Sequence, residues 1–245
     1  MRLQFVGCGD AFGSGGRFNT CFHVTGNTTN FLIDCGASSL IALKQLEIDR
    51  NAIDAILFSH FHADHFGGLP FFMLDAQFTA RRTRPLTILG PRGLPGWYSR
   101  VMETAFPGAS GTQPKFALTL REIEPGAPAD VGALKVSAFP VKHDERAGPC
   151  LAYRIEVEGR VLTYSGDTEW TDTLIDAARG ADLFVCEAYA REKPIKSHMS
   201  VALLEAQLDE ISPKKLVLTH MGEDMLARRA EVPHQAAHDG LIVEF

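Results

Sequence analysis

The stretch Ala55-Ile56-Leu57-Phe58-Ser59-His60-Phe61-His62-Ala63-Asp64-His65-Phe66-Gly67-Gly68 contains a short apolar run that leads directly into three histidines and an aspartate. The run Ala55–Ser59 has the composition of a buried strand. Histidines two residues apart in an extended segment point in the same direction, so His60 and His62 can bind one cation. A tight turn, permitted by the following glycine pair, would bring Asp64 and His65 to a neighbouring position. A solvated polar loop is the alternative, but it would gather these side chains only by coincidence, and we predict a metal site.

Three further predicted strands end near a residue type that binds metals. The pairs of strand and residue are Leu134–Phe139 with His143, Val161–Tyr164 with Asp167, and Leu216–Thr219 with His220. Each residue alone has an ordinary explanation, as a polar strand end, a helix N-cap or a surface histidine. Their repetition at the same relative place favours convergence on one edge of a sheet. The chain then supplies five histidines and two aspartates, enough for two metal ions that share one carboxylate. Zinc suits such nitrogen-rich ligands best, with manganese or iron as alternatives.

The length and composition are those of a globular protein. The 245 residues allow one large domain or two small ones, and no repeat or linker divides them, so we expect a single domain over residues 1–245. Hydrophobic residues make up 45% and charged residues 22%, which excludes a disordered or fibrous chain. No apolar run approaches the roughly 20 residues that cross a bilayer. The start, Met1–Gly7, has the pattern of a strand and not of a signal peptide, so we expect a cytoplasmic protein with no membrane partner.

The net charge bears on the class of partner that we expect, and the cysteines bear on the state of their thiols. Lys and Arg total 24 against 30 Asp and Glu, a net charge of −6, which disfavours a protein that mainly binds a nucleic-acid backbone. The five cysteines are odd in number and form no C-x-x-C pair, so we expect buried free thiols at Cys8, Cys21, Cys35, Cys150 and Cys186.

Hydrophobic periodicity predicts short strands followed by turns or helices in both halves of the chain. Besides the strands above, we expect strands at Leu3–Gly7, Cys21–Thr25, Phe31–Cys35, Leu86–Leu89, Phe116–Arg121, Leu151–Val157, Leu183–Cys186 and Leu241–Phe245. We expect helices after a cap at Ser38 or Ser39, around Leu69–Phe78, at Trp97–Phe106, near Thr171–Ala178 and from about Ser200 to Ile211. Sheets covered by helices, a layered α/β domain, follow from this order.

Several motifs together resemble the metallo-β-lactamase-fold hydrolases, and most closely their ribonuclease Z-like branch. The H-x-H-x-D-H run, a later histidine, a Gly-Asp after a strand and a final Thr-His carry the superfamily resemblance. The branch is indicated by Gly7-Cys8-Gly9-Asp10-Ala11, Arg17-Phe18-Asn19-Thr20, Phe31-Leu32-Ile33-Asp34-Cys35-Gly36, Ala181–Ala188, His198 and Leu216–His220. The resemblance spans most of the chain and implies a four-layer αββα sandwich with the metal ions at one edge of its two sheets.

The resemblance also implies roles for individual residues. One zinc ion would be bound by His60, His62 and His143, and a second by Asp64, His65 and His220, with Asp167 bridging both. Catalysis would involve Asp64 and the pair His198 and Glu187, in which the carboxylate orients an imidazole that protonates the leaving group. A solvated histidine before a helix at Ser200 is the alternative for His198.

The chain departs from ribonuclease Z proper in one region. The interval Asp144–Gly166 holds only two strands and a turn at Glu158-Gly159, where those enzymes carry a long arm that binds tRNA. Met199 also replaces a small hydroxyl residue. We therefore expect phosphodiester hydrolysis of a small anionic substrate, with lactone or thioester hydrolysis as the alternative. A tRNA 3′-processing endonuclease and a non-catalytic binding protein are less favoured. Relatives commonly form two-fold dimers, which implies a homodimer.

Weaker features have two interpretations each. Asp34 is either a residue that orients a histidine ligand or an ordinary strand end. The segment Gly13-Ser14-Gly15-Gly16 indicates a turn, with Arg17 as a candidate contact of an anionic substrate, and a phosphate-binding loop is the less favoured alternative. The basic residues Arg81, Arg82 and Arg84 indicate a solvated face or the rim of an anion site. The aromatic residues Phe71, Phe72, Phe78 and Trp97 are expected mostly in the core, with one or two of them as candidates to line the mouth of the substrate site.

Overall fold

Two seven-stranded sheets pack face to face in the computed structural model, which describes residues 1–193 and 195–245. The first sheet has the order β14-β1-β2-β3-β4-β5-β6. Its strands are β1 (Arg2–Gly7), β2 (Cys21–Thr25), β3 (Asn30–Ile33), β4 (Ala55–Leu57), β5 (Leu86–Pro91), β6 (Leu118–Ile123) and β14 (Ile242–Glu244). The second sheet has the order β13-β12-β11-β10-β9-β8-β7. Its strands are β7 (Ala129–Val131), β8 (Leu134–Pro140), β9 (Leu151–Val157), β10 (Arg160–Tyr164), β11 (Leu183–Glu187), β12 (Leu216–Thr219) and β13 (Gln235–Ala236).

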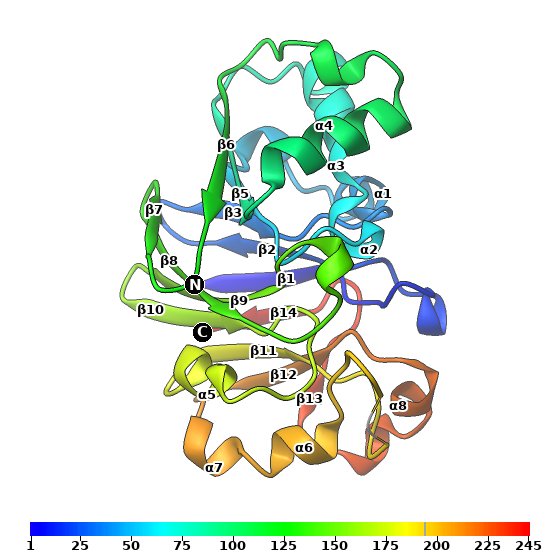
Figure 1. Ribbon diagram of the computed structural model, residues 1–245, viewed down its shortest axis with the longest axis vertical. Helices are drawn as coiled ribbons and strands as arrows, with labels where there is room; N and C mark the ends of the chain where they lie inside the picture. The colour runs from blue at the N-terminus through cyan, green and yellow to red at the C-terminus, as the bar shows by residue number, and fades with distance from the viewer. Residues whose placement is uncertain (194) are drawn as a thin grey trace.

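Helices cover the outer face of each sheet, so the molecule has four layers (Figure 1). The first sheet is covered by α1 (Ser39–Gln45), α2 (Ala63–Phe66), α3 (Leu69–Leu74) and α4 (Leu94–Ala105). The second is covered by α5 (Thr173–Ala178), α6 (Val201–Glu205), α7 (Leu208–Ile211) and α8 (Glu223–Ala227). This arrangement confirms the predicted αββα sandwich. Among the described residues, none of the helices has the length and apolar character that crossing a membrane requires.

Alternation of side chains along the strands builds three apolar layers. In β3, Phe31 and Ile33 face the other sheet, whereas Leu32 packs under the helices. In β11, Val185 faces the inter-sheet core and Phe184 packs under the helices of its own side. Because both faces of these strands are covered, the strands are apolar throughout and reactive side chains are left to the strand ends. All five cysteines are buried and free, as predicted.

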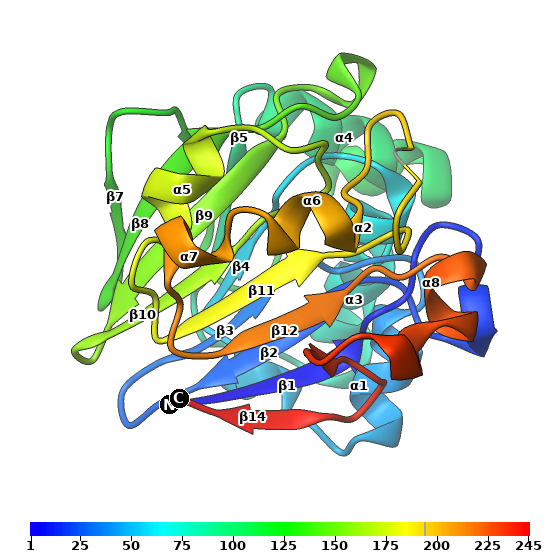
Figure 2. The same cartoon turned by 90° about the horizontal axis from the view of Figure 1, so that it is seen from below.

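Strand direction fixes where those ends lie. Strands β10, β11 and β12 are parallel to one another, and β8 runs the same way because it pairs antiparallel with β9, which pairs antiparallel with β10. Figure 2 shows the arrowheads of β11 and β12 at the end of the sandwich where α2 and α8 lie, with both termini at the opposite end. The carboxyl ends of these strands therefore share one edge.

Several predicted elements have different bounds in the structure. The helix expected from Ser200 to Ile211 is two helices: α6 ends at Glu205, and α7 begins at Leu208 and packs against α5. The helix after Leu69 continues as a π-helical turn over Asp75–Thr79. The short strands β7 and β13 were not predicted, since they carry no alternating apolar run. Ser38 does occupy an N-cap, but its hydroxyl group bonds Asn19 instead of the helix backbone.

The prediction for two aromatic residues was wrong. Phe71 and Phe78 are 44% and 64% exposed, because they lie on the outer side of α3 and of the turn that follows it. Phe72 is in the core, and Trp97 packs at its border.

Arg82 is buried, so both interpretations of the basic cluster are wrong for this residue, whereas Arg81 and Arg84 are exposed. Its guanidinium group donates hydrogen bonds to the backbone carbonyls of Arg84, Arg50, Asn51, Ile53 and Pro85. Only 2% of the residue is exposed, and its cation lies over the ring of Phe116 at 5.5 Å. Arg82 therefore joins the loop before β4 to the loop before β5.

We expect Arg82→Met to lower the free energy of unfolding by about 2–4 kcal/mol, since it leaves buried carbonyl groups without donors. Urea denaturation measures the change. The matched control is Arg81→Met, which removes an exposed neighbouring cation and should change stability by less than about 0.5 kcal/mol. Equal stability of the two variants would contradict this role for Arg82.

Candidate metal centre

The predicted ligands come together at the shared edge of the two sheets. Residues 60 to 65 follow β4 of the first sheet, whereas His143, Asp167 and His220 follow β8, β10 and β12 of the second. Backbone hydrogen bonds join the two sheets at this edge: Leu151 N donates to Ser59 O at 3.0 Å, and His220 N donates to Cys8 O at 3.0 Å. Packing of the two sheets thus determines the distances between ligands that are far apart in the sequence.

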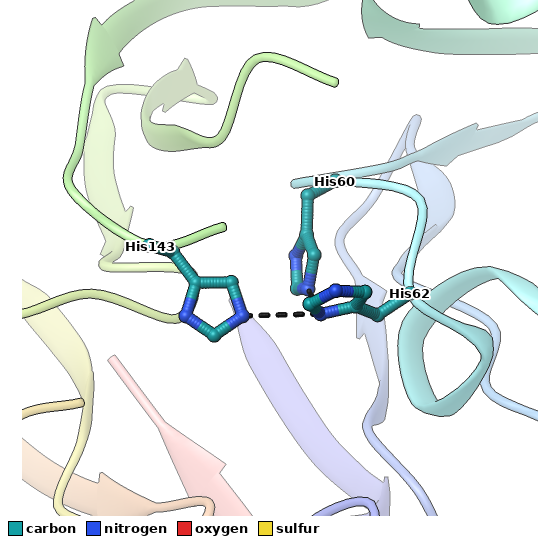
Figure 3. Close-up of side chains that lie close together, drawn as sticks. All are labelled: His60, His62 and His143. Atoms are coloured by element: carbon teal, nitrogen blue, oxygen red, sulfur yellow. Dashed lines mark hydrogen bonds between the residues drawn. The ribbon is translucent and has the colours of Figure 1, made fainter. Parts of the chain in front are cut away.

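A first cluster consists of three histidines whose ring nitrogens face one another (Figure 3). Nδ1 of His62 lies 3.1 Å from Nε2 of His60 and 3.1 Å from Nε2 of His143. All three nitrogens can present lone pairs to a single cation, which is the donor set of a zinc site.

A second cluster consists of Asp64, His65, Asp167 and His220, all of them buried. Nε2 of His65 lies 3.3 Å from Oδ2 of Asp64, 3.3 Å from Oδ2 of Asp167 and 3.4 Å from Nε2 of His220. Nε2 of His220 lies 3.3 Å from the same oxygen of each carboxylate. Two imidazoles and two carboxylates converging in this way also form a donor set for a divalent cation.

Asp167 lies between the two clusters. Its Oδ2 is 3.8 Å from Nε2 of His143 in the first cluster, in addition to its contacts in the second. Its Oδ1 is buried and has no hydrogen-bond partner among the described residues. A buried carboxylate oxygen without a partner costs free energy, and a bound cation would supply the missing interaction. The residues present therefore fit a metal centre.

Charge within the site is balanced between carboxylates and imidazoles. Burial opposes ionisation of Asp167, but the charges of His220 and His65 outweigh it and hold the pKa of this carboxyl well below its usual range. Burial disfavours protonated His65, but the carboxylates of Asp167, Asp64 and Asp34 raise the pKa of His65 well above its usual value. Burial also disfavours protonated His220, but this effect is outweighed, mainly by the charge of Asp167, and the pKa of His220 rises to about 9. Burial lowers the pKa of His60, which keeps that ring neutral and able to bind a metal.

Asp34 orients one of the histidines, as one of its two interpretations proposed. Its Oδ2 accepts a hydrogen bond from Nδ1 of His65 at 2.7 Å, and its two oxygens also accept bonds from the Ser59 amide and hydroxyl groups. A proton on Nδ1 leaves Nε2 of His65 with its lone pair directed into the second cluster.

His198 and Glu187 form a pair beside both clusters. Nδ1 of His198 lies 3.0 Å from Oε2 of Glu187, and the His198 ring stacks on those of His220 and Tyr189. Burial disfavours protonated His198, but its hydrogen bond and charge interaction with Glu187 raise its pKa. This histidine is therefore not a solvated residue.

The sequence did not identify the group that orients His143. Nδ1 of His143 donates to the Ser197 carbonyl group at 2.7 Å, and the Ser197 amide donates to Oε1 of Glu169 at 2.7 Å. Lys142 contacts the other oxygen of Glu169, also at 2.7 Å. The segment that carries His198 is thus attached to a predicted metal ligand. The partner of His143 is a backbone carbonyl, which no residue type reveals in a sequence.

The glycine turn has a structural role. Residues Ser14–Gly16 form a short 3-10 turn whose amides are bonded by the buried carboxylate of Asp10 and by Glu223. Arg17 extends to the Cys8 sulfur atom, with Nη1 to Sγ at 3.6 Å, so contact with a substrate stays a prediction.

Comparisons with known proteins agree with this architecture. A family described as the beta-lactamase superfamily domain matches residues 29–221. Ribonuclease Z of Agathobacter rectalis is 30% identical in an alignment that covers 86% of this chain and 84% of that protein. Ribonuclease BN of Escherichia coli is 27% identical in an alignment that covers 78% of each chain.

Solved structures share the whole fold at low sequence identity. Human short-form tRNase Z has a TM-score of 0.81 at 22% identity, covering 100% of this chain and 99% of its own. A diphosphatase of the PhnP family has a TM-score of 0.78 at 22% identity, covering 100% and 97%. The two sheets, the helices on both faces and the sequence relatives lead to the same assignment. The chain belongs to the β-lactamase superfamily, has the metallo-β-lactamase fold, and is a metal-dependent hydrolase similar to ribonuclease Z.

Proposed function

We propose that this hydrolase uses two metal ions to cleave phosphodiester bonds in a small anionic substrate. The observation that carries the proposal is the position of Asp167 between two clusters of donors, with one buried oxygen that has no hydrogen-bond partner in the described part of the chain. His60, His62 and His143 would bind one ion, and Asp64, His65 and His220 the other, with Asp167 bridging them. Zinc is the first choice, with manganese or iron as alternatives. Such a pair, when bound, supplies a water of lowered pKa and neutralises charge on the reacting group.

The protein's own residues have separate tasks in this proposal. Asp64 is 8% exposed and lies at the second cluster, where its carboxylate can orient the attacking water and accept its proton. Nδ1 of His198 is engaged by Glu187, which leaves Nε2 as the nitrogen that protonates the departing oxygen. Glu187 is fully buried and accepts a further hydrogen bond from the Thr168 amide, so it holds the imidazole in one orientation.

The His198–Glu187 pair favours phosphodiesters over thioesters. An alkoxide leaving from a phosphodiester needs a proton, whereas a thiolate leaving from a thioester departs without one. The names of the relatives, ribonuclease Z, ribonuclease BN and a diphosphatase, support the same preference. Lactone or thioester hydrolysis at the same centre is the alternative that an assay must separate.

The short region between His143 and Asp167 is an argument for a small substrate. It contains a 3-10 turn at Glu145–Ala147 and the hairpin of β9 and β10, with no extended arm. The hairpin tip lies against the body of the protein, because Glu158 accepts hydrogen bonds from the amides of Asn27 and Thr28. The small substrate, the cytoplasmic location and the homodimer remain predictions.

Zinc should stabilise the folded chain through the proposed ligands. At a hundredfold excess over its dissociation constant, a ligand specific for the folded state adds about 2.7 kcal/mol. We expect zinc to raise the melting temperature of the wild-type protein and EDTA to reverse the rise, with a much smaller response in Asp167→Asn. Scanning calorimetry measures both. A full response in Asp167→Asn would contradict the bridging role.

Hydrolysis should depend on both clusters. We expect zinc- or manganese-loaded protein to cleave bis(p-nitrophenyl) phosphate, and His65→Ala and Asp167→Ala to lose at least about 100-fold in kcat/KM, because each removes a proposed ligand. Circular dichroism establishes that the variants are folded. Full activity in both variants would refute the proposed metal ligands. Turnover of a lactone or thioester, with no cleavage of the phosphodiester, would favour the alternative substrates.

The role of His198 can be tested with leaving groups of different basicity. We expect His198→Ala to lose about 100-fold more activity on an alkyl leaving group, which needs a proton, than on p-nitrophenolate. Steady-state kinetics on ethyl and p-nitrophenyl esters of the same nucleotide measure the difference. An equal loss on both esters would argue against proton donation by His198.

A further inference from the structure

A groove of about 510 Å³ opens beside the metal centre and belongs to none of the roles above. Its apolar lining includes Phe12, Tyr189 and Ile195, and its charged lining includes Glu192, Glu223 and Asp224. The groove is large enough for a nucleoside and offers both apolar and charged side chains to it.

Tyr189 places the groove next to the proposed proton donor. Its ring stacks on that of His198 with 4.6 Å between centroids and 23° between planes, and lies 6.3 Å from the ring of His220. Gly222 packs closely against Tyr189, since a Cβ atom there would lie 3.0 Å from Cζ of Tyr189. The Tyr189 ring is therefore held in place, and the groove starts where a leaving group would depart.

Phe12 is an aromatic side chain without a place in the core. It is 80% exposed, although the loop that carries it is well ordered by hydrogen bonds. The amides of Phe12 and Ser14 and the Ser14 hydroxyl group all donate to the buried carboxylate of Asp10. An exposed aromatic ring on a fixed loop costs little conformational entropy when it stacks on a ligand.

The charges of the groove select against a further phosphate group. Three carboxylates face it against two cations, Lys193 and Arg228, and Arg228 already pairs with Glu192 and Glu231. A polynucleotide strand would bring additional negative charge to this surface. An uncharged nucleobase would not, and its amino group could donate hydrogen bonds to the carboxylates.

We propose that this groove binds the nucleoside of the leaving group, with Phe12 and Tyr189 as stacking surfaces for its base. This inference rests on the proposed phosphodiester hydrolysis, in which His198 would protonate the oxygen atom that leaves with the nucleoside. It narrows the substrate class to small phosphodiesters in which a nucleoside is released.

Binding of free deoxyadenosine to zinc-loaded protein tests the groove without any turnover. We expect calorimetric titration to show binding that is about 10-fold weaker in Phe12→Ala, in keeping with the loss of one base-stacking surface. The matched control is Phe78→Ala, which removes another exposed aromatic ring, in the turn Asp75–Thr79 and outside the groove, and should leave the dissociation constant unchanged. Tyr189→Phe should retain binding. No binding of deoxyadenosine, or equal affinity in Phe12→Ala and wild type, overturns the proposal.

A kinetic comparison separates this inference from the proposed function. The two substrates are the dinucleoside monophosphate of deoxyadenosine, which releases a nucleoside whichever ester bond breaks, and deoxyadenosine 3′-(methyl phosphate), followed through its release of methanol. We expect the ratio of their kcat/KM values to fall about 10-fold in Phe12→Ala and to stay constant in Phe78→Ala. An unchanged ratio in Phe12→Ala overturns the groove proposal while hydrolysis itself stands. Binding of deoxyadenosine through Phe12 with no cleavage of either ester supports the groove and refutes the phosphodiesterase.

Discussion

A buried carboxylate that needs positive charge on several sides is the constraint on which the rest of the site depends. Asp167 is 2% exposed and faces His65, His143 and His220. Without a cation, protons on His65 and His220 supply the compensating charge, as the raised pKa values of both rings show. A bound cation would take over that compensation and release the protons, so metal loading and protonation of the site are linked equilibria.

The fold satisfies this constraint by placing the proposed metal-binding residues at one shared edge of the two sheets. Strands covered on both faces are apolar, so the polar side chains occupy the segments that follow the strands. The first sheet contributes the histidine-rich segment after β4, and the second contributes His143, Asp167 and His220. The Tyr153 hydroxyl group donates to the Phe58 carbonyl group at 2.6 Å, which links the second sheet to the segment that leads into His60. Stability of the inter-sheet core is therefore a condition for the geometry of the site.

Around the centre, the surroundings restrict what can react. The β9–β10 hairpin is short and lies against the protein, so this region offers no extended platform for a folded RNA. The proposed groove ends at His198 and carries more negative than positive charge. Both features agree with the proposals of a small phosphodiester substrate and of a nucleoside as its leaving group.

Local patterns alone predicted a layered α/β domain and the seven candidate ligands, because apolar strands with His or Asp after them are visible in the sequence. They left Asp34 open between two interpretations, and the four-layer αββα sandwich came from the family resemblance. The resemblance also indicated the pair of His198 and Glu187. Only the tertiary structure showed that Arg82 is buried among backbone carbonyls, that Phe71 and Phe78 are exposed, and that Ser197 orients His143. It alone placed Phe12 and Tyr189, which are 177 residues apart, on one groove. The reason is physical: periodicity along a strand or helix fixes which residues share a face, whereas contacts between segments depend on how sheets and loops pack, and that packing leaves no local signature.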